Sequence, residues 1–557
     1  MTGKQIPENF PAPAAGEKLF SAESARALDA RAASWGLDPF ALVEAAGRGC
    51  ARAFTGFGPG LFSGPPKKVV AAAGSGNNGA DALVMLRALI LEGYVSSASA
   101  GVVINRLPGG EDHTPRSEAL RVLGNMGVPV YEWKEPVSEA GSAGDGGSGA
   151  LARADIIIDG IAGTGLRGPL SGAAGEMTRW IGECKKDREA GAGRPFIVSI
   201  DIPSGNFDGY EPSMPIIEAD VTLAVEPKKT CLFGPGARFF AGTILSVDGI
   251  FPPGLTQTFD GPELLTWKQA GRRIPPIRPD AHKYERGVVE IRAGSVGSAG
   301  AARIAARGSQ AVGAGIVRLL IDEALYPVLA ASAGGVMVFP VKADKKREGD
   351  PASGGDPPGT EPPEGGRFCP DAVLLGPGWG RSPERLPVLR KAVEREAGGT
   401  PLILDADAIA LSRDITFHGN GILTPHLGEF AAFTGIPRER ILSNAVSIVA
   451  DTARKIRAAI LFKSHVLIIA GEDGRVGIVD GMAPVLAAGG SGDLLAGFCA
   501  AIAARMRRRG EYDGYTCAAA AAALLAETGR APDTARGFTD PLELAEKAAS
   551  LAGEAWL

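Results

Sequence analysis

Cysteine is scarce in this sequence, and its spacing excludes two kinds of site. The 557 residues include six cysteines, and no two of them form a C-x-x-C pair. They are Cys50, Cys184, Cys231, Cys369, Cys499 and Cys517. Scattered cysteines argue against a disulfide framework and against a zinc site, and they favour reduced thiols in a cytosolic compartment.

Long apolar runs and an excess of charge of one sign are absent as well. No run reaches the length of about 18 uninterrupted apolar residues that a membrane-spanning helix needs, and the N-terminal residues lack the apolar core of a signal peptide. The 58 basic and 63 acidic residues are well mixed and leave a net charge of −5. We therefore expect a cytoplasmic protein, with no nucleic-acid partner and no membrane partner. We also expect a homo-oligomer.

The chain is long enough for more than one domain, and 45% of its residues are hydrophobic. We expect a loose, Pro-rich tail over residues 1–20, a first domain over 21–253 and a second domain over 281–557. The Pro-rich stretch 254–280 between them is expected to be a linker. Residues 341–368 are rich in Pro, Gly and charge, which predicts a disordered surface insertion.

Short apolar runs alternate with helical stretches in both domains. They lie near 68–72, 100–104, 155–159, 196–200 and 219–225 in the first domain, and near 288–292, 315–321, 372–375, 402–404, 421–424 and 466–469 in the second. Nearly continuous apolar strands separated by helices predict parallel sheets covered on both faces. The expected fold class is α/β, with two three-layer α/β/α domains.

The most specific motif lies near the C-terminus, where a glycine-rich stretch leads into an apolar helix. Gly490, Ser491 and Gly492 can present backbone N–H groups at the start of that helix, which favours an anion such as phosphate. Asp493 has the wrong charge to bind phosphate, so we interpret it as a base that takes a proton from an attacking hydroxyl. The alternative is a glycine turn with Asp493 as a simple N-cap.

Polar loops follow three strands of the first domain. The stretch 74–81 formally matches G-x-G-x-x-G, but the acidic residue expected about 20 positions later could only be Glu92, which is too close for an ordinary dinucleotide site. Asn77, Asn78 and Asp81 add side-chain oxygens, and Asp159 and Asp201 follow the next two strands. Such strand ends meet in one crevice, where oxygens could hold a hard monovalent cation. The alternative is ordinary turn chemistry.

Several strand ends of the second domain could share a crevice with Asp493. Loops at 294–302, 376–380, 404–408 and 424–429 each follow a predicted strand, and Lys463 precedes another. The chain has only five histidines, and His426 lies in one of these loops beside Glu429. A lone histidine is commonly a structural hydrogen-bonder, but its place at a strand end favours a role in binding.

The first domain resembles the NAD(P)H-hydrate epimerase domain, a Rossmann-like fold, in Leu42–Gly47, Asn77–Asp81, Asp159–Pro169 and Asp201–Gly205. The resemblance implies a potassium ion on Asn78, Asp159 and Ser204, with Asp201 as the acid–base residue facing the substrate. It implies that the hydrated nucleotide binds Asn77, Asn78, Gly79, Ala80, Asp81, Gly163, Thr164, Gly165, Leu166, Arg167, Gly168, Pro169 and Asp201. Ala80 and Ala82 stand where the family usually has glycine, and Ala45 where it has asparagine.

The second domain resembles the ADP/ATP-dependent NAD(P)H-hydrate dehydratases, which are ribokinase-like, in its segments 376–380, 424–429 and 490–493. The resemblance implies substrate binding by Ala301, Gly378, His426 and Asp493. It implies nucleotide phosphates on Lys463, Gly490, Ser491 and Gly492, with Mg²⁺ assisting. Ser464 follows Lys463 where the family has glycine, and segment 481–486 is also atypical.

Together these resemblances imply a bifunctional enzyme that repairs nicotinamide nucleotides. Its substrates would be NADHX and NADPHX, the hydrates of NADH and NADPH. The first domain would interconvert their R and S epimers. The second would phosphorylate the C6 hydroxyl of the S epimer with ADP or ATP and eliminate phosphate, with Asp493 and Asp201 as catalytic residues. One alternative is a vitamin or sugar kinase of the ribokinase type, and another treats the first domain as a nucleotide-binding module without activity.

Overall fold

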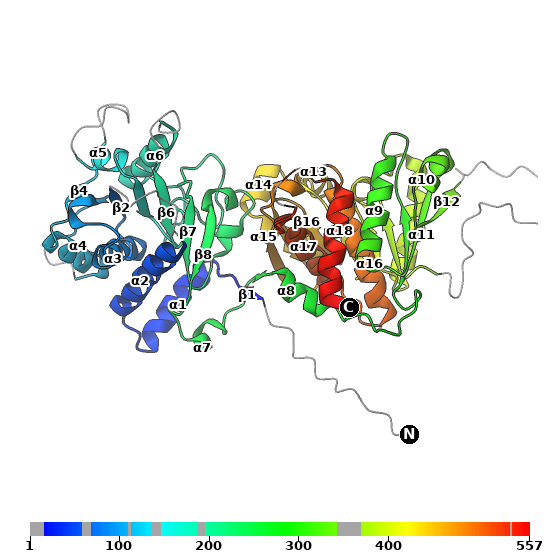
Figure 1. Cartoon of the computed structure of the whole chain (residues 1–557), viewed down its shortest axis with the longest axis horizontal. Coiled ribbons are helices and arrows are strands. Elements are labelled where there is room, and N and C mark those ends of the chain that lie inside the picture. The colour runs from blue at the N-terminus through cyan, green and yellow to red at the C-terminus, as the bar shows by residue number, and fades with distance from the viewer. Residues whose placement is uncertain are drawn as a thin grey trace, which may run out of the picture. The chain divides into compact units, whose positions relative to one another are not determined.

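The computed structural model describes residues 16–57, 68–109, 113–135, 146–187, 195–341, 369–534, 537 and 539–557. These residues form two compact units (Figure 1). The N-terminal unit comprises Lys18–Pro262 and Leu442–Asn444. The C-terminal unit comprises the described residues up to Glu17, Glu263–Ile441 and Ala445–Leu557.

The N-terminal unit is built on a sheet of seven strands in the order β4-β3-β2-β5-β6-β7-β8, and all its strand pairs are parallel. The strands are β2 (Val69–Ala73), β3 (Ala100–Ile104), β4 (Val130–Glu132), β5 (Ile156–Gly160), β6 (Phe196–Ile200), β7 (Val221–Val225) and β8 (Thr243–Val247). Strands β2, β3, β5 and β7 are buried along their whole length, which explains their nearly continuous apolar sequence.

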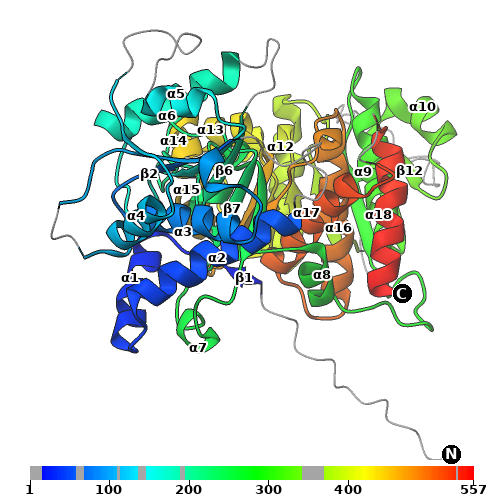
Figure 2. The same ribbon diagram turned by 60° about the vertical axis from the view of Figure 1, so that its left-hand side comes forward.

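Helices cover both faces of this sheet. The helices are α1 (Ala22–Ser34), α2 (Pro39–Phe57), α3 (Asn77–Leu91), α4 (Pro115–Asn125), α5 (Gly147–Ala152), α6 (Gly172–Asp187) and α7 (Pro253–Thr256), with 3₁₀ turns at Ser97–Ser99, Thr230–Phe233 and Arg238–Ala241. One core joins Ala71 and Ile158 to α2, α3 and α4, while the other joins Val70 and Ile157 to α5 and α6. Neighbouring strand residues thus point to opposite layers. Figure 2 shows α2 and α3 side by side.

The C-terminal unit carries a sheet of eleven strands in the order β1-β9-β18-β17-β16-β15-β14-β13-β10-β11-β12. The strands are β1 (Glu17–Lys18), β9 (Glu263–Leu264), β10 (Val288–Arg292), β11 (Ile316–Asp322), β12 (Met337–Val341), β13 (Ala372–Leu375), β14 (Leu402–Leu404), β15 (Gly421–Leu423), β16 (Ala458–Phe462), β17 (Val466–Ala470) and β18 (Val476–Asp480). The run from β12 to β16 is parallel, and β17 is antiparallel to both its neighbours.

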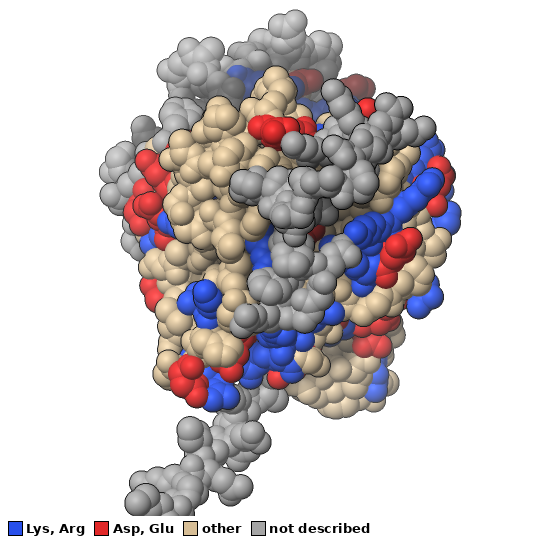
Figure 3. All heavy atoms as spheres, turned by 90° about the vertical axis from the view of Figure 1, so that its right-hand side faces the viewer, with Lys and Arg blue, Asp and Glu red and all other residues tan. Residues whose placement is uncertain are grey.

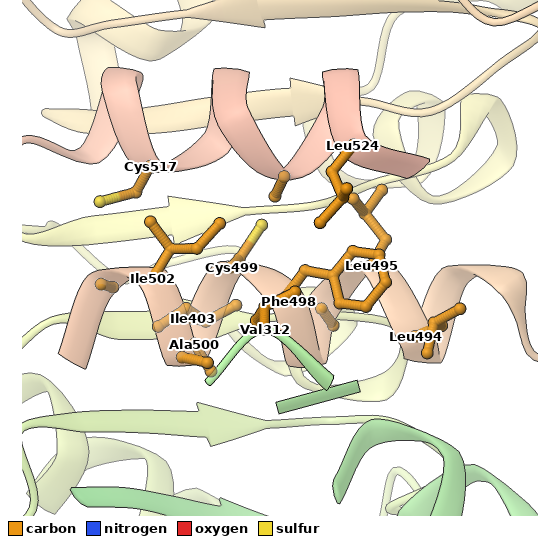
Figure 4. Packing of buried hydrophobic residues seen from close by; sticks show 14 of the residues in the cluster. Val312, Ile403, Leu494, Leu495, Phe498, Cys499, Ala500, Ile502, Cys517 and Leu524 are labelled. Atoms are coloured by element: carbon orange, nitrogen blue, oxygen red, sulfur yellow. The ribbon is translucent and has the colours of Figure 1, made fainter. Parts of the chain in front are cut away.

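Two helical layers enclose this sheet. The helices are α8 (Trp267–Ala270), α9 (Ala299–Ala311), α10 (Tyr326–Ala331), α11 (Leu386–Ala397), α12 (Asp407–Leu411), α13 (Leu427–Thr434), α14 (Arg438–Ser443), α15 (Ala445–Ile456), α16 (Ser491–Arg508), α17 (Gly514–Arg530) and α18 (Pro541–Trp556), with 3₁₀ turns at Gly271–Arg273, Glu323–Leu325, Pro383–Arg385 and Pro484–Leu486. The larger core joins α9, α16, α17 and α18 to the sheet. Figure 4 shows its seam, where Leu495 and Cys499 of α16 face Leu524 and Cys517 of α17. The predicted α/β class with parallel sheets is confirmed.

The boundary segments differ from their predictions. Leu19 and Phe20, expected in the tail, are buried, because the backbone N–H of Leu19 donates to the Pro262 carbonyl and that of Phe20 to the Lys228 carbonyl. In the expected linker, β9 pairs with β18, and Trp267 is buried with its ring centroid 5.3 Å from that of Trp556. The expected insertion lies almost wholly in residues 342–368, outside the described part of the chain.

The surface agrees with the mixed composition. On the face drawn in Figure 3, Lys and Arg side chains lie among Asp and Glu side chains. None of the helices in the described ranges combines the length and apolar character needed to cross a membrane.

Candidate active sites

A buried hydrogen-bonded network joins two strand ends in the N-terminal unit. Asp159 lies in β5 and is fully buried; its Oδ2 accepts hydrogen bonds from Ser199 Oγ (2.7 Å) and from the Ser204 backbone N–H (2.9 Å). Ser204 Oγ donates to Asp159 Oδ1 over 2.5 Å and accepts from the Ala162 N–H over 2.9 Å. Burial raises the pKa of Asp159, and these hydrogen bonds oppose the rise. These hydrogen bonds hold the carboxylate of Asp159 and the hydroxyl of Ser204 next to each other.

Asn78 completes this oxygen cluster from the next strand end. Its Nδ2 donates to the Ala162 carbonyl over 2.9 Å, whereas its Oδ1 is buried with no hydrogen-bond partner among the described residues. An unpartnered buried amide oxygen costs free energy unless a ligand satisfies it. A Cβ on Gly163 would lie 3.0 Å from Asn78 Cβ, so the loop after β5 begins against this side chain. The structure thus brings together the three residues predicted to hold the cation.

The loop predicted at Asn77–Asp81 is instead the first turn of α3, which begins at Asn77. The loop itself is limited to Gly74–Gly76. The first turn of α3 packs directly on it, since a Cβ on Gly79 would lie 2.4 Å from the Gly74 carbonyl oxygen. Ala80 and Ala82 are buried inside this helix, and neither has a positive φ. Alanine is the strongest helix former, so both departures from glycine suit a helix here.

Asp201 lies at the end of β6 in a strained conformation. Its φ is +63°, and it is 9% exposed. Lys229 Nζ donates to Asp201 Oδ1 over 2.6 Å and to the Val225 carbonyl over 2.9 Å. Burial raises the pKa of Asp201, while the ammonium of Lys229 opposes that rise. Strained backbone that the surrounding structure maintains is typical of functional positions.

A second carboxyl, Asp81, shares this environment. Its Oδ1 is buried without a hydrogen-bond partner among the described residues. Burial raises its pKa well above the ordinary value, and the negative charge of Asp201 raises it further. Asp81, Asp201 and Lys229 together form a group that can donate a proton and can also accept one. The predicted nucleotide-binding residues Thr164–Pro169 are partly buried or exposed, and Arg26 Nη1 donates a hydrogen bond to the Thr164 carbonyl over 2.9 Å.

Lys229 and Ser199 were missed by the sequence prediction. Lys229 follows β7, so the same rule that selected Asp201 at the end of β6 could have found it. Ser199 points from within a strand and left no signal in the sequence.

In the C-terminal unit, a buried ion pair links two strand ends near Asp493. Lys463 Nζ donates to Asp405 Oδ1 over 2.5 Å, and Thr424 Oγ1 donates to the same oxygen over 2.8 Å. Burial acts to lower the pKa of Lys463, but Asp405, Glu429 and Asp493 together raise it above its ordinary value. Lys463 therefore stays charged beside the glycine-rich turn.

Asp493 occupies the first turn of α16, whose N-cap is Gly490 with a φ of +100°. It lies three residues after that cap and is therefore no N-cap itself. Burial raises the pKa of Asp493 to about 6, the charge of Asp405 adds to the rise, and Lys463 opposes it. A Cβ on Gly492 would lie 3.2 Å from Lys463 Nζ, so the lysine sits directly against the turn. The unit thus places a cation, backbone N–H groups and a weakly acidic carboxyl together.

Glycine-rich loops bring two further predicted residues together. Gly378 has a φ of +57°, and a Cβ on it would lie 3.0 Å from Ala301 Cβ. A Cβ on Gly376 would lie 1.8 Å from the Asp405 carbonyl oxygen. These close approaches explain the glycines and connect the loops after β10, β13 and β14 to the Asp405–Lys463 pair.

His426 is the N-cap of α13. Its Nδ1 accepts from the Gly428 N–H over 2.9 Å, while Nε2 lies 3.2 Å from Glu429 Oε1. Its ring is half-exposed, so Nε2 can also face a ligand. Ser464 caps its own turn, since its Oγ donates to the Val466 carbonyl over 2.6 Å. Serine is therefore accommodated at the position where glycine is expected from the sequence resemblance.

Comparison with known proteins identifies the family. Residues 39–231 match the YjeF-related protein N-terminus, and residues 289–550 match the NAD(P)H-hydrate dehydratase family. A bifunctional NAD(P)H-hydrate repair enzyme Nnr from Salinibacter ruber is 30% identical over 496 residues, covering 85% of this chain and 84% of that protein. The chain belongs to the bifunctional NAD(P)H-hydrate repair enzymes.

Two further proteins illustrate how much of the chain such matches cover. A protein of the same name from Methanopyrus kandleri is 29% identical over 471 residues, covering 84% of each chain. Among solved structures, the ADP/ATP-dependent NAD(P)H-hydrate dehydratase from Bacillus subtilis, co-crystallised with ATP and Mg²⁺, is 21% identical. It has a TM-score of 0.43 and covers 52% of this chain and 98% of that one.

Proposed function

We propose that this enzyme repairs the hydrates of NADH and NADPH, with both reactions on one chain. The N-terminal unit interconverts the R and S epimers, and the C-terminal unit dehydrates the S epimer with ADP or ATP as phosphoryl donor. The observation that carries the proposal is that each unit has one buried acidic site beside a lysine: Asp201 is paired with Lys229 in the N-terminal unit, and Asp493 lies beside the Asp405–Lys463 pair in the C-terminal unit. The family matches of both units support it over a vitamin or sugar kinase and over an inert nucleotide-binding module.

The dehydration follows from the position of Asp493. Its carboxylate takes the proton of the C6 hydroxyl as that oxygen bonds to the transferring phosphorus and the bond to the donor nucleotide breaks. The N–H groups of Gly490–Gly492 and the ammonium of Lys463 bind the phosphoryl oxygens. The ring nitrogen then expels phosphate as the C6–O bond breaks, and loss of the C5 proton restores the double bond. The products are NAD(P)H, phosphate and a nucleotide that is one phosphate shorter.

Epimerisation requires C6 to lose one of its bonds and to regain it on the opposite face. C6 carries both the hydroxyl and the ring nitrogen, so removal of the hydroxyl proton lets the C6–N bond break to an aldehyde as the nitrogen is protonated, and the nitrogen then adds back to the other face of the carbonyl. Asp201 and Lys229 form a buried acid–base pair able to hold and return the proton. We place the substrate ring against Asp201, with the nucleotide along Asn77–Asp81 and Gly163–Pro169.

The two cation sites are part of the proposal. For potassium, the residues present fit, because Asn78 Oδ1 is an unsatisfied buried oxygen beside Asp159 and Ser204. A bound potassium ion would supply a fixed positive charge for the anionic parts of the substrate. For Mg²⁺, no group of three or more His, Cys, Asp or Glu side chains able to hold a metal occurs within the described ranges. Mg²⁺ is commonly held by one or two carboxylates and the substrate's phosphates, and Asp405 and Asp493 are the carboxylates that could take part.

We also propose a cytoplasmic location and a homo-oligomeric state. None of the six cysteines, all of which lie in the described ranges, forms a disulfide, and five of them are buried, which supports a reducing compartment.

The proposal is tested by supplying the protein with mixed NADH hydrates and with ADP or ATP in turn. We expect the absorbance of reduced nicotinamide to recover fully, with one phosphate released per molecule repaired. A stable phosphorylated product without recovery would instead support the kinase alternative. Recovery limited to the S fraction, above the spontaneous rate, would count against the epimerase assignment.

The potassium site gives a separate prediction. Asn78→Leu removes the unpartnered amide oxygen, so we expect the potassium concentration for half-maximal epimerisation to rise by about tenfold or more. The measurement is the epimerisation rate against potassium at constant ionic strength. Asn125→Ala, a change to an exposed amide of the same unit outside the site, should leave this dependence unchanged. An unchanged potassium dependence in Asn78→Leu would remove this residue from the site.

A further inference from the structure

A cavity of about 400 Å³ lies at the C-terminal end of α16, in the C-terminal unit. Five arginines line it, namely Arg278, Arg286, Arg505, Arg508 and Arg509, against two acids, Glu285 and Glu511. Arg505 follows Asp493 by twelve residues on the same helix, a separation of about 18 Å at 1.5 Å per residue. The cavity is therefore separate from the proposed dehydratase site.

Arg505 has an unusual environment for a charged side chain. It is 3% exposed, and none of its three guanidinium nitrogens has a hydrogen-bond partner among the described residues. Its guanidinium carbon lies 4.2 Å from the centroid of the Trp556 ring, which is held in place by a hydrogen bond from Trp556 Nε1 to the Gly271 carbonyl. The cation–π contact satisfies one face of the guanidinium, but not its N–H groups. A buried charge left in this state is costly.

Neighbouring arginines increase the positive charge at this point. A Cβ on Gly313 would lie 3.4 Å from Arg286 Nη2 and 3.9 Å from Arg505 Nη1, so the two guanidiniums converge beside this glycine. The pKa of Arg505 is lowered to about 10, mainly by burial and in part by the charges of Arg286 and Arg509. Two like charges that converge at one point, those of Arg286 and Arg505, favour binding of an anion.

Each of the other arginines uses part of its guanidinium group in contacts with the protein, and the remaining N–H groups are available to a ligand. Arg286 Nε donates to the Gly313 carbonyl over 3.0 Å, and Arg508 Nε donates to the Tyr284 carbonyl over 3.1 Å. Arg509 Nη1 donates to the Pro276 carbonyl over 3.3 Å, and Arg278 pairs with Asp280 at the surface. Arg508 Nε also lies 3.6 Å from Asp371 Oδ2, and Arg509 Nε lies 3.6 Å from Glu511 Oε1, so carboxylates offset part of the charge of these outer arginines but leave the guanidinium of Arg505 without a hydrogen-bond partner among the described residues. Planar forks fixed in this way match the paired oxygens of a phosphate group.

We propose that this cavity binds a small phosphate-bearing anion, with the buried guanidinium of Arg505 as its central contact. The volume falls in the range of small-molecule sites, about 300–1,000 Å³. Ile277 and Ala281 give the wall an apolar part, and His282 and Tyr284 add ring edges, so the ligand class extends to a phosphorylated organic molecule. The site is distinct from the nucleotide phosphates at Gly490–Gly492.

The test uses inorganic pyrophosphate without Mg²⁺, titrated by calorimetry into the full chain at constant ionic strength. Arg505→Met keeps the length and the contact with Trp556 but removes the charge. We expect it to weaken pyrophosphate binding at this site by at least tenfold. Without ligand its thermal midpoint should equal or exceed that of the wild type, because the buried charge has no hydrogen-bond partner. Pyrophosphate that binds at Gly490–Gly492 would do so equally in every variant. A difference in affinity between the variants therefore reports binding in the cavity.

Arg507→Gln is the matched control, since it removes one positive charge from the same helical turn. Arg507 Nε donates to the Gly399 carbonyl over 2.8 Å, and the residue does not line the cavity. Arg278→Gln alters an exposed cavity arginine and tests the proposal if Arg505→Met fails to fold; we expect it to weaken binding several-fold. Wild-type affinity in both cavity variants, or equal weakening in Arg507→Gln, would overturn the proposal and leave Arg505 as a packing partner of Trp556.

Discussion

Replacing Asp493 by asparagine is expected to lower the rate of dehydration by about 10²–10⁴-fold, the usual contribution of a positioned general base. Asparagine keeps the size of the side chain but cannot accept the hydroxyl proton. The N–H groups of Gly490–Gly492 and the charge of Lys463 remain, so nucleotide binding should change little. The measurement is kcat and KM for the S hydrate, and the loss should fall on kcat.

The pH dependence of kcat/KM in the wild type should reflect the ionisation of Asp493. Its pKa is raised to about 6, because burial and Asp405 disfavour the charged form. The base is active when deprotonated, so kcat/KM should be flat above about pH 7 and fall tenfold per unit below about pH 6. In Asp493→Asn this fall should disappear from the residual activity.

The thermal stability of Asp493→Asn distinguishes a chemical role of Asp493 from a structural one. Since the pKa of Asp493 is raised in the folded chain, its ionisation at neutral pH destabilises the fold, and asparagine removes that cost. The thermal midpoint of Asp493→Asn should therefore equal or exceed that of the wild type. Glu543→Gln is the control, because Glu543 is also an acid in the first turn of a helix, α18. Near-wild-type kcat in Asp493→Asn would contradict the base assignment.

The sequence predicts the sheets and their ligand-binding edges because the signal is local. A buried parallel strand is apolar along its whole length, and the polar residue that follows it marks the edge where ligands bind. This reasoning placed Asp159 and Asp201 in one unit and the loop containing Asp405 in the other, whereas Asp493 was predicted from the glycine-rich stretch before an apolar helix. The strands that were not predicted are β1, β4, β8, β9, β12, β16 and β18. β12 lies in a stretch where burial is only partial, and Pro340, the fourth of its five residues, is atypical of a strand.

Features that depend on distant partners were not predictable. Leu19 and Phe20 look like part of a Pro-rich tail until their backbone groups meet Pro262 and Lys228. Arg505 belongs to a basic run at the end of a helix, which normally reads as solvated and favourable to the helix dipole. Its burial against Trp556 depends on how α16 and α18 pack.

Replacing Asp201 by asparagine is expected to reduce epimerisation by about 10²–10⁴-fold, toward the spontaneous rate, while dehydration of the S hydrate continues unchanged. Asparagine is the appropriate substitution because Asp201 has a φ of +63°, a region that asparagine tolerates better than alanine. Its side-chain oxygen can still accept the hydrogen bond from Lys229. Alanine would leave that ammonium buried and unpaired, at a cost of about 3–5 kcal/mol, and would confuse instability with lost chemistry.

The bifunctional chain provides its own control for this variant. With mixed hydrates and a phosphoryl donor, the wild type should restore all the reduced nicotinamide in one phase. Asp201→Asn should restore the S fraction at the normal rate and the R fraction only as fast as it epimerises spontaneously. Asp248→Asn, a change to an exposed acid of the same unit, should behave as the wild type. A single rapid phase in Asp201→Asn would show that the proton transfer belongs elsewhere, and Asp81 would then be the next carboxyl to replace, because its pKa is raised by the same burial and by Asp201 itself.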